Sequence, residues 1–288
     1  MKLISYLYQD SVRYGVLQDD GVIDIAKCLP DAPTGVNEFI ALSNARPSLL
    51  DDIQARVGSC QATPLTDVTL LPSVPRPGKV VCLGVNYLDH AKEGGNKVYD
   101  YPTIFLRCAT SLVAHGAPIQ LSPISTALDY EAELAVVIGR VTKNVKAVDA
   151  LQHVFGYTCF NDATYRDYQK RTTQWTIGKN FDQTGGFGPH LVTADELPPG
   201  CQGLHIESRL NGKVMQSANM DALIYPVAQT LELLSQCLTL EPGDVVLMGT
   251  PAGVGYARTP PVFMCAGDVI EVEIEGIGTL RNPVGAQG

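Results

Sequence analysis

The sequence has little that would direct its 288 residues into a membrane, onto a nucleic acid or along a secretory route. No apolar run approaches the ~20 residues that span a bilayer, and the N-terminus lacks the apolar segment of a signal peptide. Basic residues are in deficit, because 21 Lys and Arg face 30 Asp and Glu, for a formal net charge of −9. This acidity disfavours nucleic acid and anionic membranes as partners, so we expect a cytoplasmic protein that acts on small molecules.

The sequence also lacks a CxxC pair, an internal repeat and a phosphate-binding loop. Its eight cysteines are dispersed along the chain. A thiolate zinc site is therefore not expected, and the thiols are predicted to be reduced, buried, small hydrophobic residues. Neither GxxxxGK followed by Ser or Thr nor a strand–GxGxxG–helix pattern occurs, which argues against the two common phosphate-binding motifs.

What is present is the composition of an ordinary globular protein, with 45% hydrophobic and 18% charged residues. Residues 1–70 predict a small α/β module, in which short strands precede helices around 36–43 and 48–57. A proline-containing linker over 71–78 leads from this module, in which we find no catalytic residues, into a larger domain placed at 71–288. The larger domain has a mostly β pattern, so the predicted fold class is α+β, mainly β.

The most informative stretch is residues 129–139, DYEAELAVVIG. Its second half is apolar and β-branched, as in a buried strand. Glu131 and Glu133 alternate onto the same face of such a strand, about 7 Å apart along it. Two carboxylates that enter a core together repel each other and are costly to bury, and a hard divalent cation such as Mg²⁺ would relieve both problems. The alternative is a solvated strand end where both glutamates pair with Arg or Lys.

A histidine and a glutamate form a second candidate group. His90 and Glu93 are spaced i, i+3, so one helical turn places them side by side. A carboxylate beside the imidazole orients the ring and raises its basicity, which suits a general base. Gly94 and Gly95 follow directly and would let the segment through Tyr101 move as a lid. The alternative is a surface turn with an incidental pair.

Further polar candidates follow an apolar strand around 154–160. Asp162 emerges at the end of this strand, where a helix N-cap is the alternative role. Arg166 and Gln169 lie one turn apart on the helix-prone segment that comes next. Lys179 follows a glycine in an apolar, aromatic segment, which favours a pocket over the surface.

A glycine-rich loop over 249–255 follows another strand. Gly249 and Thr250 begin this loop, and their backbone N–H and hydroxyl groups are suited to hold a carboxylate. An ordinary surface loop is the alternative.

Eight short motifs, taken together and in order, resemble the fumarylacetoacetate hydrolase family over about residues 79–279. The motifs are GxNYxxHxxE (84–93), DYEAELAVVIG (129–139), GYxxxND (156–162), RDxQ (166–169), GKxFD (178–182), LEPGD (240–244), GTPxGVG (249–255) and EGIGT (275–279).

The resemblance implies a mixed β-sandwich roll, a homodimer and a bound Mg²⁺ or Mn²⁺. The implied metal ligands are Glu131, Glu133 and Asp162. The resemblance also implies that His90 and Glu93 form a water-activating dyad on a segment that orders when substrate binds.

The resemblance further implies a set of pocket residues. Lys179 matches the active-site lysine of the family, and Thr250 matches the residue that grips the substrate carboxylate. Arg166 and Gln169 match polar residues near the pocket. Arg107 stands where relatives often have a lysine followed by proline, and it remains a candidate cation near the pocket with a geometry that differs from that of lysine.

The implied activity is hydrolysis of a C–C bond in a 3-acylpyruvate-type (2,4-dioxo) acid such as fumarylpyruvate, as in aromatic catabolism. His90 and Glu93 would activate water, Lys179 would stabilise the oxyanion, and the metal would stabilise the enolate that leaves. The same enolate chemistry supports two alternatives, an oxaloacetate-type decarboxylase and a 2-oxo acid keto–enol tautomerase or isomerase. A non-catalytic metal-binding scaffold is a third alternative. The joint presence of His90, Glu93 and Lys179 argues against it.

Overall fold

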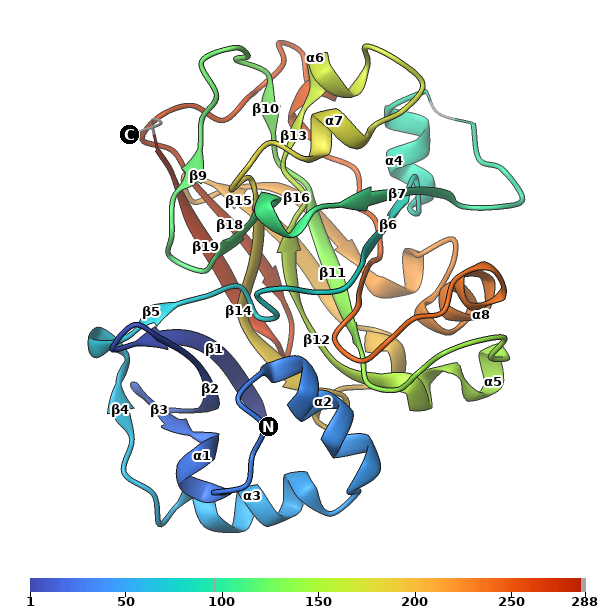
Figure 1. Cartoon of the computed structure of the whole chain (residues 1–288). Helices are drawn as coiled ribbons and strands as arrows, with labels where there is room; N and C mark the ends of the chain where they lie inside the picture. The colour runs from blue at the N-terminus through green and yellow to red at the C-terminus, as the bar shows by residue number, and fades with distance from the viewer. Residues whose placement is uncertain (96, 286–288) are drawn as a thin grey trace.

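The computed structural model describes residues 1–95 and 97–285. Asn96, inside the segment predicted to act as a lid, and residues 286–288, at the end of the predicted larger domain, lie outside the described residues. The described chain contains one large mixed sheet, a five-stranded sheet and a two-stranded sheet (Figure 1). This architecture confirms the predicted fold class, α+β and mainly β.

The large sheet runs through both predicted parts of the chain. Its strands are β1 (Lys2–Tyr8), β2 (Ser11–Gln18), β3 (Gly21–Asp24), β4 (Thr63–Pro64), β5 (Thr69–Leu70), β6 (Val80–Gly84), β7 (Thr103–Arg107), β8 (Leu112–Ala114), β11 (Ala132–Ile138), β12 (Val154–Asn161), β14 (Gly185–Thr193) and β17 (Val245–Leu247). Their order is β4-β3-β2-β1-β14-β12-β11-β17-β6-β7, with β5 beside β1 and β8 beside β14. Because β1 pairs with β14, the N-terminal strands extend the sheet of the larger domain, and a division at residue 70 stays a prediction.

The five-stranded sheet packs against one face of the large sheet. Its order is β16-β15-β18-β19-β9, and its strands are β9 (Ile119–Gln120), β15 (His205–Leu210), β16 (Lys213–Asn219), β18 (Val269–Ile274) and β19 (Gly278–Gly285). Leu134, Val136 and Ile138 of β11 share a buried core with Val272 and Leu280 of this sheet. The two sheets therefore form a sandwich with β11 near its centre.

The N-terminal module covers the other face of β11. Ala135 and Val137 pack in a second core with Phe39 of α2 (Val36–Ala45) and Ile53 of α3 (Leu49–Val57), helices that the sequence predicted to within two residues. β11 is thus buried on both faces, which explains its continuous apolar run. Since side chains alternate along a strand, Glu133 lies on the same face as Ala135 and Val137.

The remaining helices lie in two groups, apart from α1 (Ile25–Cys28) in the N-terminal module. Figure 1 shows α4 (Leu88–Glu93), α6 (Arg166–Gln169) and α7 (Thr176–Lys179) gathered at the end of the molecule away from the N-terminal module, near the two-stranded sheet of β10 (Leu128–Asp129) and β13 (Thr164–Tyr165). The other group, α5 (Ala147–Ala150) and α8 (Val227–Cys237), covers one flank. Within the described ranges, no helix is long and apolar enough to cross a membrane.

The cysteines depart from the prediction that they are all buried. Cys108, Cys237 and Cys265 are exposed, and Cys60 is half-buried. Each exposed cysteine lies at the end of an element or in a loop: Cys108 follows β7, Cys237 is the last residue of α8, and Cys265 begins a turn before β18. The apolar residues around these cysteines predicted burial. The ends of helices and strands, and the loops beside them, face solvent more often than the middles of these elements do.

Candidate active site

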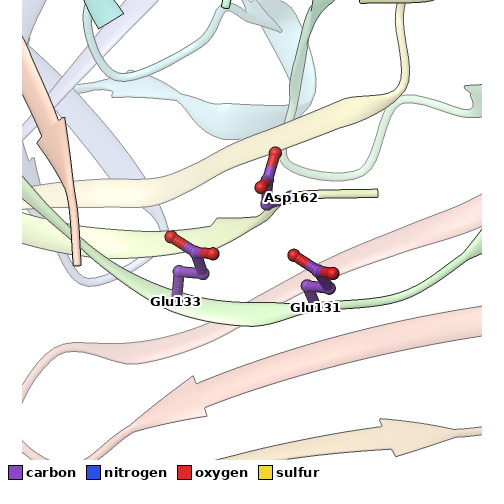
Figure 2. A group of neighbouring side chains, drawn as sticks. All are labelled: Glu131, Glu133 and Asp162. Carbon is purple, nitrogen blue, oxygen red and sulfur yellow. The ribbon is translucent and has the colours of Figure 1, made fainter. Parts of the chain in front are cut away.

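Three carboxylates converge at one end of the neighbouring central strands β11 and β12, where β11 begins and β12 ends (Figure 2). Glu131 directly precedes β11, Glu133 lies within it, and Asp162 directly follows β12. The antiparallel register pairs Ala132 with Asn161, and the Asp162 N–H donates to the Glu131 carbonyl oxygen at 2.8 Å. One oxygen from each of the three carboxylates lies within 4.8 Å of the others, and all three side chains are buried. We call these residues the acidic triad.

Three buried cations contact the acidic triad or its neighbours. The Lys179 ammonium bridges Glu131 Oε2 at 2.6 Å and Asp162 Oδ2 at 2.5 Å. Arg166 Nη1 lies 2.6 Å from Glu131 Oε1, and Arg107 Nη1 lies 2.5 Å from Asp162 Oδ1. We call Lys179, Arg166 and Arg107 the cationic set. Charge-assisted contacts of this length hold Glu131 and Asp162 firmly in the core.

Glu133 is the member of the acidic triad that forms no ion pair with the cationic set. Its Oε2 accepts the backbone N–H of Gly249 at 2.9 Å, and no ion pair of the described residues includes it. Burial, with the nearby charges of Asp162 and Glu131, raises the pKa of Glu133 well above its ordinary value. The pKa of Glu131 moves the other way, to about 2, because the charges of Arg166 and Lys179 outweigh the effect of burial.

Lys179 stays protonated in this environment. Burial alone would lower its pKa, but the charges of Asp162 and Glu131 outweigh that effect and raise it. The side chain is therefore a hydrogen-bond donor and a fixed positive charge, not a base at neutral pH.

His90 and Glu93 are adjacent on α4, as their spacing predicts. His90 Nδ1 lies 3.6 Å from Glu93 Oε2, and the His90 side chain is 9% exposed. Both carboxylate oxygens of Glu93 accept the Gly253 N–H at 3.0 Å. Although partial burial opposes it, these contacts with His90 and Gly253 lower the pKa of Glu93. The glutamate is thus an anchored anion beside the imidazole.

The glycine-rich loop distributes its backbone N–H groups among the protein's own acids. The Gly249 N–H binds Glu133, the Gly253 N–H binds Glu93, and the Gly255 N–H binds Asp129 Oδ1 at 2.7 Å. Gly253 has φ +105°, and a Cβ there would lie 2.1 Å from a backbone oxygen, so only glycine fits. The N–H of Gly249, which the sequence suggested for a substrate carboxylate, is already engaged.

Thr250 remains available to a ligand. Its Oγ1 accepts a hydrogen bond from Gln216 Nε2 at 2.7 Å, which leaves the hydroxyl hydrogen free to donate. Gln216 is itself buried, and its Oε1 accepts the Ala132 N–H at 2.9 Å. This glutamine, which the sequence motifs did not single out, ties the loop to the start of β11.

A cavity of about 150 Å³ opens between these groups. Of the residues singled out from the sequence, its wall contains His90, Glu131, Glu133, Arg166, Gln169, Lys179 and Thr250. Further wall residues are Leu83, Gly84, Val85, Phe105, Lys170, Trp175 and Tyr256. Asp162, Glu93, Gly249 and Arg107 are not part of the wall. Asp162 lies behind it and contacts the wall residue Lys179, and the fully buried Arg107 side chain binds Asp162, Ser111 and Thr184.

Besides Gln216 and the apolar wall residues, three site residues were not singled out as such from the sequence. Asp129 is buried and accepts hydrogen bonds from the N–H groups of Gly255 and Tyr256 and from Arg166 Nε. Lys170 and Tyr256 line the cavity beside Arg166. Asp129 is the first residue of the motif 129–139, and this position beside the two glutamates was a usable signal in the sequence. Lys170 and Tyr256 come together only through the tertiary fold.

Comparison with known proteins places this site in a family. Residues 79–285 match the family described as fumarylacetoacetate (FAA) hydrolase C-terminal. The chain belongs to the fumarylacetoacetate hydrolase family.

Individual relatives cover nearly all of the chain. It is 39% identical over 291 residues to the oxaloacetate tautomerase fahd2, mitochondrial, of Xenopus laevis, across 99% of this chain and 90% of that protein. The solved fumarylacetoacetate hydrolase of Exiguobacterium antarcticum has 36% identity and a TM-score of 0.84, with 100% of both chains covered. Maleylpyruvate hydrolase from Sphingobium sp. SYK-6, solved with manganese(II) and pyruvate, has 28% identity and a TM-score of 0.82, again with 100% of both chains covered. Since the Xenopus relative is named mitochondrial, a cytoplasmic location stays a prediction, as does the homodimer.

Proposed function

We propose that this chain is a divalent-metal-dependent enzyme that interconverts the keto and enol forms of a small 2-oxo acid, with oxaloacetate as the first candidate. The observation that carries the proposal is the acidic triad, whose three side chains are buried together and whose Glu131 and Glu133 line a small cavity. The oxaloacetate tautomerase named among the relatives, aligned over 99% of this chain, supports the choice of reaction.

The donor set fits a hard divalent cation such as Mg²⁺ or Mn²⁺. Its oxygens are carboxylate oxygens, which these ions prefer. Asp129 and the acidic triad carry four formal negative charges, whereas the cationic set carries three positive charges. With every carboxyl ionised, as binding of a metal ion requires, the group carries one excess negative charge. A divalent ion held by Glu131, Glu133 and Asp162 would turn this into one excess positive charge, which favours an anionic substrate.

When bound, the ion would supply the charge that polarises the 2-oxo group and makes the protons on C3 more acidic. His90, oriented by Glu93, takes a proton from C3, and the enolate oxygen takes a proton from water, so that the enol forms; in the reverse direction both transfers are reversed. Lys179, which is protonated, stabilises negative charge as it develops on the oxygen of the 2-oxo group. The Thr250 hydroxyl holds the substrate carboxylate.

A second candidate function is hydrolysis of a C–C bond in an acylpyruvate. The His90–Glu93 pair favours it, because an anchored carboxylate beside an imidazole also suits activation of water. The similarity to a maleylpyruvate hydrolase solved with pyruvate supports the same reading. In this reaction, His90 removes a proton from water and Lys179 stabilises the oxyanion at the attacked carbonyl.

Three assays run in parallel separate these activities. The first follows loss of enol-oxaloacetate absorbance with Mg²⁺ or Mn²⁺, against a metal-only control. The second couples pyruvate release from oxaloacetate to a dehydrogenase, and the third follows absorbance loss of acylpyruvates. A tautomerase accelerates the first without pyruvate release, a decarboxylase gives pyruvate in the second, a hydrolase consumes acylpyruvates in the third, and a scaffold is silent in all three.

The matched variants are His90→Gln and His205→Gln. His205 lies on β15, outside the cavity wall, and contacts Ser217. We expect His90→Gln to lower kcat by about 10²–10⁴-fold, the usual contribution of a positioned acid–base group. Equal rates for His90→Gln and the wild type would refute the assigned role.

A further inference from the structure

Lys170 lines the cavity without an acidic partner. It follows α6, and its ammonium nitrogen lies 4.2 Å from the centroid of the Tyr256 ring. The ion pairs of the cavity, as far as the structure describes it, are made by the cationic set, and none of them includes Lys170. A contact with a ring face leaves the N–H donors of the ammonium group unused.

Lys170 is an exposed residue, and no ion pair of the described residues includes it. Arg166 packs on the same Tyr256 ring, with its Cζ 4.4 Å from the centroid. The Nη2 atom of Arg166 is buried and has no hydrogen-bond partner in the structure as described. Burial and the neighbouring Arg166 charge lower the pKa of Lys170, although the charge of Asp129, which binds Arg166, opposes this shift.

The cavity has two regions, one at Glu131 and Glu133 and the other at Lys170 and Tyr256. Together they limit which part of a ligand can lie near Lys170. Glu131, Glu133 and Thr250 lie on the wall, and in the proposed reaction the 2-oxo end of the substrate faces the two glutamates while the Thr250 hydroxyl holds its 1-carboxylate. Arg166 connects the two regions, because its Nη1 binds Glu131 and its guanidinium group packs on the Tyr256 ring. The cavity, at about 150 Å³, is smaller than the roughly 300–1,000 Å³ of sites for drug-sized ligands, so the far end of the substrate must be short.

We infer that Lys170 is a specificity-determining residue, which binds the distal carboxylate of a short 2-oxo dicarboxylic acid at the Tyr256 side of the cavity. The inference rests on the proposed function for the placement of the first carboxylate. Oxaloacetate has such a distal carboxylate, whereas acetylpyruvate has a neutral methyl ketone in its place. Lys170 thus selects dicarboxylic over monocarboxylic 2-oxo acids by a direct charge-assisted contact.

The test compares Lys170→Met, Lys170→Arg and a control, Lys213→Met, on two substrates. Lys213 is an exposed lysine at the start of β16. For oxaloacetate, we expect Lys170→Met to raise KM about tenfold with kcat nearly unchanged, and Lys170→Arg to restore most of the loss. For acetylpyruvate, all variants should match the wild type.

A binding measurement keeps this inference separable from the proposed function. Calorimetry with Mg²⁺ compares difluoro-oxaloacetate, which has no C3 proton to transfer, with pyruvate. Lys170→Met should weaken the first ligand about tenfold and leave pyruvate unchanged, whether or not any substrate is turned over. Equal weakening of both ligands would show a structural role, and unchanged affinity for difluoro-oxaloacetate would show that Lys170 does not contact the distal carboxylate. Either result overturns the inference.

Discussion

Glu131 and Glu133 should respond in opposite ways to the same isosteric change in metal-free protein. Glu131 bonds two buried cations, with Arg166 Nη1 and Lys179 Nζ each 2.6 Å from its oxygens. Glu133 bonds only the Gly249 N–H, and burial raises its pKa well above the ordinary value. A carboxylate that neutralises two cations and one that is itself unpaired make very different contributions to stability.

The expected magnitudes follow from these contacts. Glu131→Gln leaves two buried cations short of an anion, and removal of one partner of a buried ion pair costs about 3–5 kcal/mol. Spread over a chain of this size, that lowers Tm on the order of 10 °C. Glu133→Gln replaces an acid whose ionised form is disfavoured by burial and by the neighbouring carboxylates, and the amide oxygen can still accept the Gly249 N–H, so the free energy of unfolding changes by no more than about 1 kcal/mol.

Thermal and urea unfolding in excess chelator at neutral pH measure both differences. Addition of Mg²⁺ or Mn²⁺ should then stabilise the wild type, by about 2.7 kcal/mol at a hundred times Kd, and should stabilise neither variant to that extent. Equal destabilisation of the two metal-free variants, or a larger loss in Glu133→Gln, would refute the assignment of the cations to Glu131.

Three further outcomes are expected. Burial and the charge of Lys2 lower the pKa of His190 to about 4, so the unfolded chain binds more protons than the folded chain between pH 4 and 6.5, and stability decreases by about 3 kcal/mol as the pH is lowered from 6.5 to 4; urea titrations should show this loss in the wild type and not in His190→Gln. The Sγ atoms of Cys28 and Cys60 lie 3.2 Å apart, so oxidised glutathione should convert them to a disulfide that raises Tm, and peptide mapping should find both cysteines reduced if this pairing is wrong. Asp129→Asn should weaken the contacts of the loop and Arg166 and lower kcat/KM more than tenfold, and unchanged kinetics would deny Asp129 a positioning role.

The core of the site was predictable because it depends on strand periodicity. The alternation in 129–139 placed Glu131 and Glu133 on one face. The pattern put Asp162 at the end of the next apolar strand, and the family resemblance joined it to the two glutamates. An antiparallel pair of adjacent strands then brings all three together, which requires only local pattern and one pairing.

The rest of the site depends on contacts between distant segments. Arg107 reaches Asp162 across 55 positions of sequence, and Gly255 reaches Asp129 across 126. Periodicity carries no information about such pairings, so the sequence suggested the loop and Arg107 for the substrate without showing which acids they bind. Lys170 illustrates the same limit, because nothing in its local sequence marks it as part of a cavity wall.

The most direct test is a crystal structure of the wild-type protein grown with Mn²⁺, with anomalous diffraction data collected at the manganese edge. The account predicts one strong anomalous peak bonded to an oxygen of each of Glu131, Glu133 and Asp162, with the peak absent from Glu133→Gln crystals. A peak bound elsewhere, or none between these oxygens at saturating Mn²⁺, would contradict it.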